Sequence, residues 1–300
     1  MKKRMISTIT AAAVLLTSFA LVQHKATASP LPKIVSSDMP IAVLYNARKI
    51  SSDVSPKMID GTVLVPIRFV AEKLKATIDL KGKDITVKKG TKTIKLTIGS
   101  KAAVINGKST TLLQAAMVEK GRTLVPLRVI SEGLAVKVEW DAVTRFVWIG
   151  NKDIPELKDV APKTKDIKDY MNYFKGNEGE LQFEGRNKTT ATIIANDLFP
   201  FQVDGRVFYR LDLAKSDKGN IYIKVVTTDK GIMVTPLFFL GPDNLYRTRN
   251  SPAYLRETVG SIRLNYYPVD ARDSYKINMA KYVGLYLSYD SLVLMNNPWR

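Results

Sequence analysis

Apolar residues recur with helical spacing at residues 61–74, which read GTVLVPIRFVAEKL. The positions concerned are Ile67, Val70, Ala71 and Leu74. They follow the order i, i+3, i+4 and i+7, which places them on one face of a helix. The run TVLV at 62–65 is rich in β-branched residues and predicts a strand before that helix. Pro66 stands between the two and suits the first position of a helix, where its missing N–H costs nothing.

The same pattern returns sixty positions later, at 121–134, as GRTLVPLRVISEGL. Without any gap, residues 41–90 and 101–150 share eleven identities at this offset. A fixed internal period indicates one supersecondary unit built twice. Hairpin patterns precede each helix, with turns at 46–47 and 106–107, and follow it at 77–87 and 137–149. We therefore expect an α+β fold whose N-terminal part is a duplicated module of hairpin, short helix and hairpin.

Each predicted helix carries an arginine and a glutamate four residues apart. The repeated motif consists of Pro66, Arg68, Glu72, Pro126, Arg128 and Glu132. An i,i+4 ion pair stabilises a helix by roughly a few tenths of a kcal/mol. We interpret the motif as structural, with a ligand site at the Arg–Glu pairs as the alternative.

Four phrases of this region carry a family resemblance: the two quoted above, LTIGSKAAVINGK at 96–108, and VKVEWDAVTRFVWIG at 136–150. They resemble the copper amine oxidase N-terminal domain, a stalk domain of many secreted proteins of Gram-positive bacteria. The resemblance covers about residues 41–151. It implies a small, non-catalytic α+β module that projects or attaches other domains at the cell surface. The copper of the family name belongs to a different domain of the amine oxidases.

The second half of the chain has another pattern. Residues 153–169 are polar and predict a linker after a stalk domain at 29–152. Residues 170–300 contain short alternating segments separated by polar turns, which predict a mostly β domain of sandwich or barrel type. The expected strands are 180–184, 189–194, 207–211, 221–226, 231–240, 261–267 and 282–295. A short amphipathic helix is expected at 167–174.

The first residues have the pattern of a secretory signal peptide. Lys2, Lys3 and Arg4 precede an apolar run at 6–22, and the small-x-small sequence ATA follows at 26–28. We expect cleavage after Ala28, with an uncleaved membrane anchor as the alternative. No later apolar run reaches eighteen residues, so we expect no transmembrane segment in the mature chain. The expected location is secreted or extracellular, in association with the cell wall.

Composition limits the chemistry. The chain has no cysteine, and its only histidine is His24 in the predicted signal peptide. Nucleophilic systems that need an imidazole base are excluded for the mature chain, as are ordinary zinc and copper sites. We expect no cofactor, no metal and no catalytic residue. A hydrolase working through carboxylates is the alternative, and its candidates are Glu178, Glu180, Glu184, Asp270, Asp273 and Asp290.

The net charge of +18 falls to about +14 when Lys2, Lys3, Arg4 and Lys25 leave with the signal peptide. A secreted basic protein meets anionic polymers first. The densest basic run lies at 81–95 and contains Lys81, Lys83, Lys88, Lys89, Lys92 and Lys95. These lysines are our candidate polyanion-binding residues, and the alternative is a solvated edge strand whose charges discourage aggregation. Specific nucleic-acid recognition is not expected.

Together these patterns predict a secreted, non-catalytic cell-envelope protein. A stalk or anchor module would carry a C-terminal binding domain, in contact with anionic wall polymer or with a secreted or surface protein. The alternatives are the wall-active hydrolase and a secreted inhibitor or adhesin that binds another protein.

Overall fold

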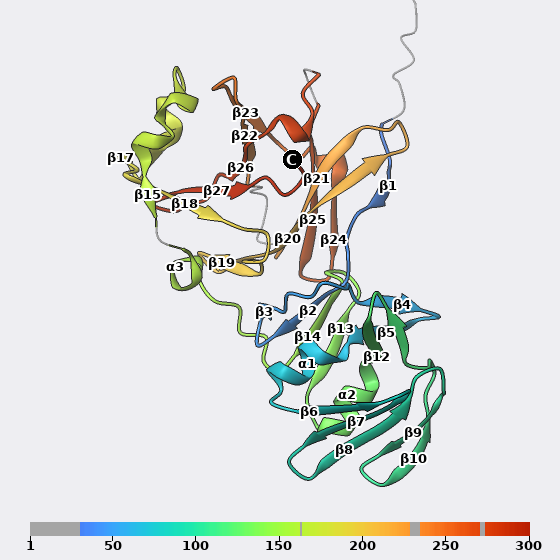
Figure 1. Cartoon of the computed structure of the whole chain (residues 1–300). Helices are drawn as coiled ribbons and strands as arrows, with labels where there is room; N and C mark the ends of the chain where they lie inside the picture. The colour runs from blue at the N-terminus through green and yellow to red at the C-terminus, as the bar shows by residue number, and fades with distance from the viewer. Residues whose placement is uncertain (1–30, 163, 229–234, 271–273) are drawn as a thin grey trace, which may run out of the picture. The chain divides into compact units, whose positions relative to one another are not determined.

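A computed structural model describes residues 31–162, 164–228, 235–270 and 274–300 (Figure 1). Lys33–Arg300 forms one compact unit. Short strands make up most of it, and the described residues contain three short α-helices, so the chain is α+β with a large excess of strand. The predicted signal peptide lies outside the described residues. Among those that are described, no helix is both long and apolar enough for a membrane crossing.

Two helices and a central sheet organise the part of the chain up to residue 150. The helices are α1 (Ile67–Lys73) and α2 (Leu127–Leu134). The central sheet has the order β11 (Met117–Glu119), β12 (Arg122–Pro126), β5 (Thr62–Pro66) and β4 (Lys57–Ile59). Strands β5 and β12 are antiparallel, with Val65 opposite Val125. The two inner strands therefore meet at positions sixty residues apart.

Two outer sheets each combine strands from 41–90 with strands from 101–150. One has the order β13 (Val138–Asp141), β14 (Phe146–Ile149), β2 (Ala42–Tyr45) and β3 (Arg48–Lys49). The other has the order β10 (Lys108–Thr111), β9 (Ala102–Ile105), β8 (Lys92–Thr97), β7 (Asp84–Lys89) and β6 (Thr77–Lys81). Strand β14 pairs in parallel with β2, whereas β8 lies between β7 and β9. Neither segment completes an outer sheet alone.

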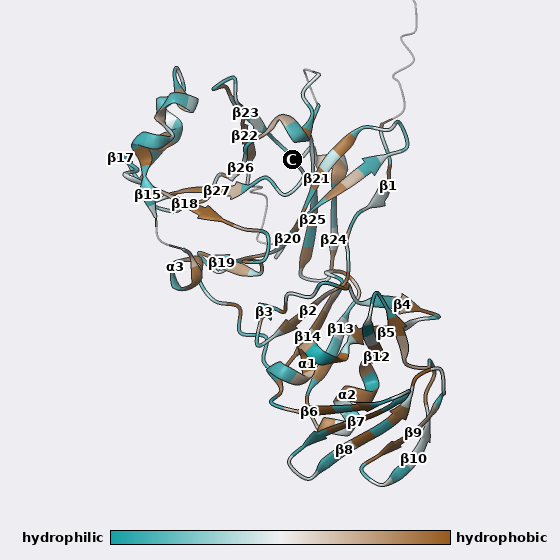
Figure 2. Ribbon diagram, viewed as in Figure 1, coloured by the Kyte–Doolittle hydropathy of each residue, from teal (hydrophilic) through white to brown (hydrophobic). Residues whose placement is uncertain are grey.

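The predicted helix faces lie in the core of this region. Their buried residues include Ile67, Val70, Leu74, Ile130 and Leu134. Figure 2 shows that α1 and α2 each carry both apolar and polar residues, as an amphipathic helix requires.

The two prolines lie one position before the helices that we expected them to begin. Pro66 and Pro126 end β5 and β12 and form the N-caps of α1 and α2. The reason is the strand ladder, in which Pro66 is paired with Leu124 and Pro126 with Leu64.

Two larger sheets form the rest of the unit. The first has the order β1 (Ile34–Ser37), β20 (Arg206–Ser216), β21 (Ile221–Thr228), β25 (Ile262–Pro268) and β24 (Arg256–Val259), with β19 (Phe201–Val203) also paired to β20. The second has the order β15 (Lys165–Asp166), β18 (Thr190–Ile194), β27 (Leu292–Asn296), β26 (Tyr282–Leu285), β22 (Leu237–Leu240) and β23 (Tyr246–Arg249). Phe208 and Ile223 of the first sheet share a buried core with Phe239, Val283 and Met295 of the second. The two sheets thus share one core, and we refer to these two sheets below as the sandwich.

Strand β1 belongs to the first of these sheets although it precedes the repeats. Ile34 is paired with Ser216 and Ser37 with Ala214, and Asp38 N donates to Leu213 O over 2.8 Å. We had assigned these residues to the stalk domain at 29–152. The other bounds of that division stay a prediction.

The segment after residue 153 also differs from expectation. The helix expected at 167–174 consists of two 3-10 turns, η1 (Ile167–Asp169) and η2 (Met171–Phe174). The strand expected at 180–184 is divided between the end of a third turn, η3 (Glu178–Leu181), and the strand β16 (Gln182–Phe183), which pairs with β17 (Arg186–Asn187). The predicted linker contains α3 (Leu157–Val160), and Leu157 is buried in the sandwich core. The burial of a few apolar side chains determines the secondary structure of this segment, because no helical or strand periodicity extends through its sequence.

Candidate functional site

Three of the six candidate lysines share one face of the β6–β10 sheet. Lys81, Lys88 and Lys95 point away from the buried residues Ile85 and Val87, because side chains alternate along a strand and paired residues share a face. We call Lys81, Lys88 and Lys95 the lysine face. Lys81 lies 3.6 Å from Asp79, and both side chains are largely exposed.

The other three lysines lie at the turns of this sheet. Lys83 is in the turn before β7, while Lys89 and Lys92 are paired opposite each other at the turn after it. These turns lie at opposite ends of β7. The sequence run at 81–95 therefore places three lysines on one face of the sheet and three more at its turns.

The two Arg–Glu pairs are not equivalent. Arg128 Nε lies 3.2 Å from Glu132 Oε1, with both side chains more than half exposed, so the pair contributes roughly 0.5 kcal/mol or less. Arg68 and Glu72 are exposed and form no ion pair with each other. One of the two expected ion pairs is therefore formed, and the structural interpretation of the motif stays a prediction.

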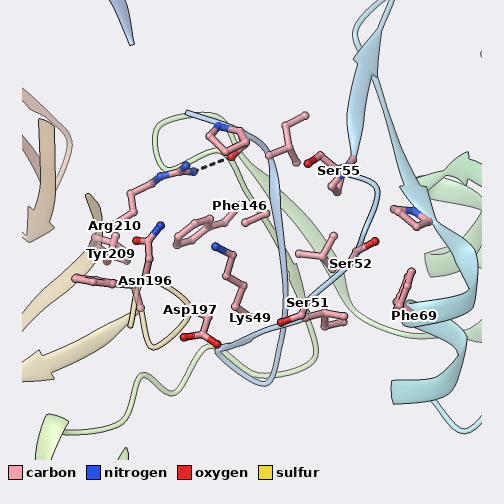
Figure 3. Close-up of a pocket in the computed structure, with 18 of the residues that line it drawn as sticks. Lys49, Ser51, Ser52, Ser55, Phe69, Phe146, Asn196, Asp197, Tyr209 and Arg210 are labelled. Atoms are coloured by element: carbon pink, nitrogen blue, oxygen red, sulfur yellow. Dashed lines mark hydrogen bonds between the residues drawn. The ribbon is translucent and has the colours of Figure 1, made fainter. Parts of the chain in front are cut away.

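Several charged and polar side chains line a cavity of about 280 Å³, which we call the Lys49 cavity (Figure 3). One side is formed by β2, β3, α1 and β14, and the other by the loop at 196–199 and β20. Among its lining residues are Lys49, Phe146, Asp197, Arg210 and Asp212. Lys49 on one side and Arg210 on the other are 161 residues apart in sequence.

A buried ion pair forms part of the wall. Arg210 and Asp212 are 7% and 6% exposed. Arg210 donates from Nε and Nη2 to the two carboxylate oxygens of Asp212 over 2.6 and 2.7 Å, and from Nη1 to Pro40 O and Thr144 O over 3.0 and 2.8 Å. The guanidinium also lies 5.3 Å from the ring centre of Phe146. Arg210 therefore bonds β20 to two loops of the preceding region.

The electrostatics of the cavity are mixed. Burial raises the pKa of Asp212, against the opposing hydrogen bonds and charge of Arg210. Burial lowers the pKa of Lys49, and the charge of Arg210 lowers it further, while Asp212 and Asp197 act in the opposite direction. Lys49 remains accessible at the cavity mouth, which limits its desolvation.

Sequence reasoning missed this cavity. Lys49 and Asp197 stand in no recognisable spacing, and only the fold brings them together. Arg210 and Asp212 did carry a signal, since two opposite charges at i and i+2 share one face of the otherwise apolar strand VFYRLDL. On a buried strand this pattern indicates a desolvated ion pair.

A comparison with known families found a match in the first region. Residues 44–149 match the copper amine oxidase N-terminal domain. The match runs from within β2 to the end of β14, as the resemblance predicted. In the amine oxidase family this domain is non-catalytic. No curated protein and no solved structure gave a significant match to the chain.

The copper amine oxidase N-terminal domain supplies Lys49 and Phe146 to the Lys49 cavity, and residues beyond the match supply Asp197, Arg210 and Asp212. Within the described ranges, no group of three or more His, Cys, Asp or Glu side chains is placed to hold a metal ion.

The candidate carboxylates lie outside this cavity. Glu178 accepts a hydrogen bond from Gly176 N, which lowers the pKa of its carboxyl. Burial lowers the pKa of Lys188, and the nearby charges of Asp290 and Glu180 act in the opposite direction. Asp273 falls outside the described residues. The carboxylates that the cavity does contain are Asp197 and Asp212, and Asp212 is bound to Arg210.

Proposed function

We propose that this chain is a secreted, non-catalytic cell-envelope protein in which a duplicated stalk domain carries a C-terminal binding domain. The observation that carries the proposal is the match of residues 44–149 to a domain that is non-catalytic in its family. Secretion rests on the signal peptide pattern of the first 28 residues.

Contacts between the two regions support the role of a spacer. Strand β1 precedes the stalk but pairs with β20 of the sandwich, and Arg210 of β20 donates to Pro40 O and Thr144 O of the stalk region. A strand ladder and a buried guanidinium oppose independent motion of the two parts. A spacer needs this property if it is to hold a binding domain at a defined distance.

We further propose that the stalk contacts anionic wall polymer through the lysine face and its neighbouring turns. From 77 to 111 the β6–β10 sheet contains eight lysines and two aspartates. Lys88 and Lys95 form no ion pair with another described residue, so their charges are available to a polyanion. Such binding weakens with salt, because counterions compete for the polymer.

A salt-graded pull-down onto purified cell walls, with and without teichoic acid, tests this proposal. We expect retention of the wild-type protein to fall as salt rises and to fall when teichoic acid is stripped. In the variant Lys88→Gln/Lys95→Gln, the slope of log affinity against log salt should decrease by roughly one for each lysine, as for other polyanions.

The matched control is Lys168→Gln/Lys175→Gln, which removes the same charge from two exposed positions of the C-terminal region. An equal loss of retention on cell walls in both variants would mean that net charge alone determines binding, and it would contradict a contact at the lysine face. Clearing of the wall suspension by the protein would contradict the non-catalytic assignment.

A further inference from the structure

The Lys49 cavity is open to solvent at one side and closed at the other. Phe146, Leu211 and Asp212 are buried and form its inner wall, whereas Lys49 and Asp197 are exposed at its mouth. In Figure 3 the Lys49 side chain extends into the space that Phe146, Asn196 and Tyr209 surround. The volume of about 280 Å³ is near the lower end for ligand sites, which suits a small molecule.

Lys49 is the cation that this cavity offers to a ligand. The other cation in its wall, Arg210, is bound bidentately by Asp212. Lys49 forms neither an ion pair nor a side-chain hydrogen bond with another described residue. An ammonium group that is partly desolvated and lacks a fixed anion gains from a bound carboxylate or phosphate.

The acidic groups of the cavity restrict the charge of that anion. Asp197 lies at the mouth without an ion-pair partner among the described residues, and Asp212 lies behind Arg210. Both carboxylates act on Lys49 through their charge. Because Arg210 offsets Asp212, a dianion such as phosphate would meet the remaining acid, Asp197, with only the single charge of Lys49 to hold it. A singly charged carboxylate fits this balance better.

Neutral polar groups complete the lining. Ser51 and Ser55 come from the segment after β3, and Asn196 and Tyr209 from the opposite side. None of these four side chains forms a hydrogen bond within the described part of the chain. Together with Asp197 they offer acceptors and donors to hydroxyl or amino groups.

We propose that the Lys49 cavity binds a small molecule with a single carboxylate and additional hydroxyl or amino groups. The carboxylate would lie against Lys49, and the hydroxyl or amino groups would face Asp197, Asn196 and the two serines. Sugar acids and amino acids share this chemistry. The inference goes beyond the proposed function and does not depend on it, because retention on cell walls tests a different surface.

Titration calorimetry on the full chain tests the proposal, with D-glucuronate and L-alanine as probes and D-glucose as the uncharged counterpart of glucuronate. We expect saturable heat from glucuronate, from alanine or from both, and none from glucose. Heat from glucuronate alone identifies a sugar acid as the source, and heat from alanine alone an amino acid. Absence of heat from both acids at about 10 mM, above the millimolar range of weak binding, overturns the proposal, as does equal binding of glucose.

Variants assign the binding to this cavity. Lys49→Gln should lower the affinity for the probe that binds by about tenfold or more, because a hydrogen bond to a charged group contributes about 1.5–3 kcal/mol. Lys49→Arg keeps the charge and should retain most of the affinity, while Lys81→Gln removes an exposed lysine elsewhere and should change nothing. Unchanged affinity in a Lys49→Gln protein with wild-type circular dichroism overturns the assignment.

Discussion

At the scale of single residues, the ion pair between Arg210 and Asp212 has the largest predicted energetic consequence. We expect Asp212→Ala to reduce the free energy of unfolding by about 3–5 kcal/mol, because it leaves a buried guanidinium without its counter-charge. Urea denaturation followed by fluorescence measures this loss.

Two further variants make the Asp212 prediction specific. The double variant Arg210→Met/Asp212→Leu removes both charges, and its free energy of unfolding should fall by less than that of Asp212→Ala. Arg128→Ala breaks an exposed ion pair and should stay within about 0.5 kcal/mol of wild type. A double variant as unstable as Asp212→Ala would show that lost contacts to the stalk, rather than an uncompensated charge, dominate.

Gly133 provides a second test at this scale. It lies in α2, where a Cβ atom would overlap Cγ1 and Cδ1 of the fully buried Ile94 in β8. Alanine improves helix propensity by about 1 kcal/mol, but overpacking costs about 1–3 kcal/mol. We expect Gly133→Ala to destabilise the protein by about 1 kcal/mol net, measured as a lower midpoint in urea.

The control for Gly133 is Lys73→Ala, at the equivalent position of α1. Lys73 is exposed, so this variant should have little effect. If Gly133→Ala raised the midpoint, helix propensity would outweigh the contact with Ile94.

The residues named above show which features of the fold could be predicted from the sequence. The spacing of Ile67, Val70 and Leu74 was sufficient to place one helix and its buried face, because helical period and burial depend on local order. Gly133 and Ile94 are thirty-nine positions apart. Their contact depends on the position of β8 between β7 and β9, which no local pattern encodes. The Lys49 cavity was unpredictable for the same reason.

At the scale of elements, β1 is the one whose sequence position and structural position differ most. It covers part of the outer edge of β20 through the pairing of Ile34 with Ser216 and Ser37 with Ala214. The four residues IVSS carry too short a pattern to reveal a partner that lies about 180 residues away in sequence. Pairing of strands distant in sequence is decided by the whole sheet.

Deletion of residues 34–37 tests the contribution of β1. We expect a loss of about 2–4 kcal/mol, from several backbone hydrogen bonds at about 1 kcal/mol each. The exposed edge of β20 should also promote self-association. Thermal unfolding and size-exclusion chromatography measure the two effects, and a deletion variant that is monomeric with a wild-type melting temperature would contradict both.

The 3-10 turns of 167–181 show why the type of secondary structure was predicted wrongly in this segment. Tyr170, Phe174 and Leu181 are buried against the outer face of the second sheet. Their spacing satisfies neither a long helix nor a strand, and Gly176 adopts a positive φ of 77° between them. A periodic pattern over eight residues was read as a helix, while tertiary packing selected two short turns.

At the scale of the whole molecule, the two repeat segments complete each other's sheets. A fragment of residues 41–90 retains β5 without β12, β2 without β14, and β7 without β8. We expect this fragment to be unfolded as a monomer, because its strands and helix face lose the surfaces on which they pack. Circular dichroism and amide proton dispersion would detect folding, and a cooperative transition in the monomeric fragment would contradict the prediction.

The pairing of β5 with β12 has one more consequence. Leu64 lies opposite Pro126 and Pro66 opposite Leu124, so the contact has the reciprocal form of an isologous interface between two identical subunits. Here a single chain supplies both sides, and residues 67–121, which include β8, connect them. In a dimer, the fraction of closed interface depends on the protein concentration. In a single chain, the effective concentration of one side around the other is fixed by the connecting segment. Such an interface therefore stays closed however far the protein is diluted.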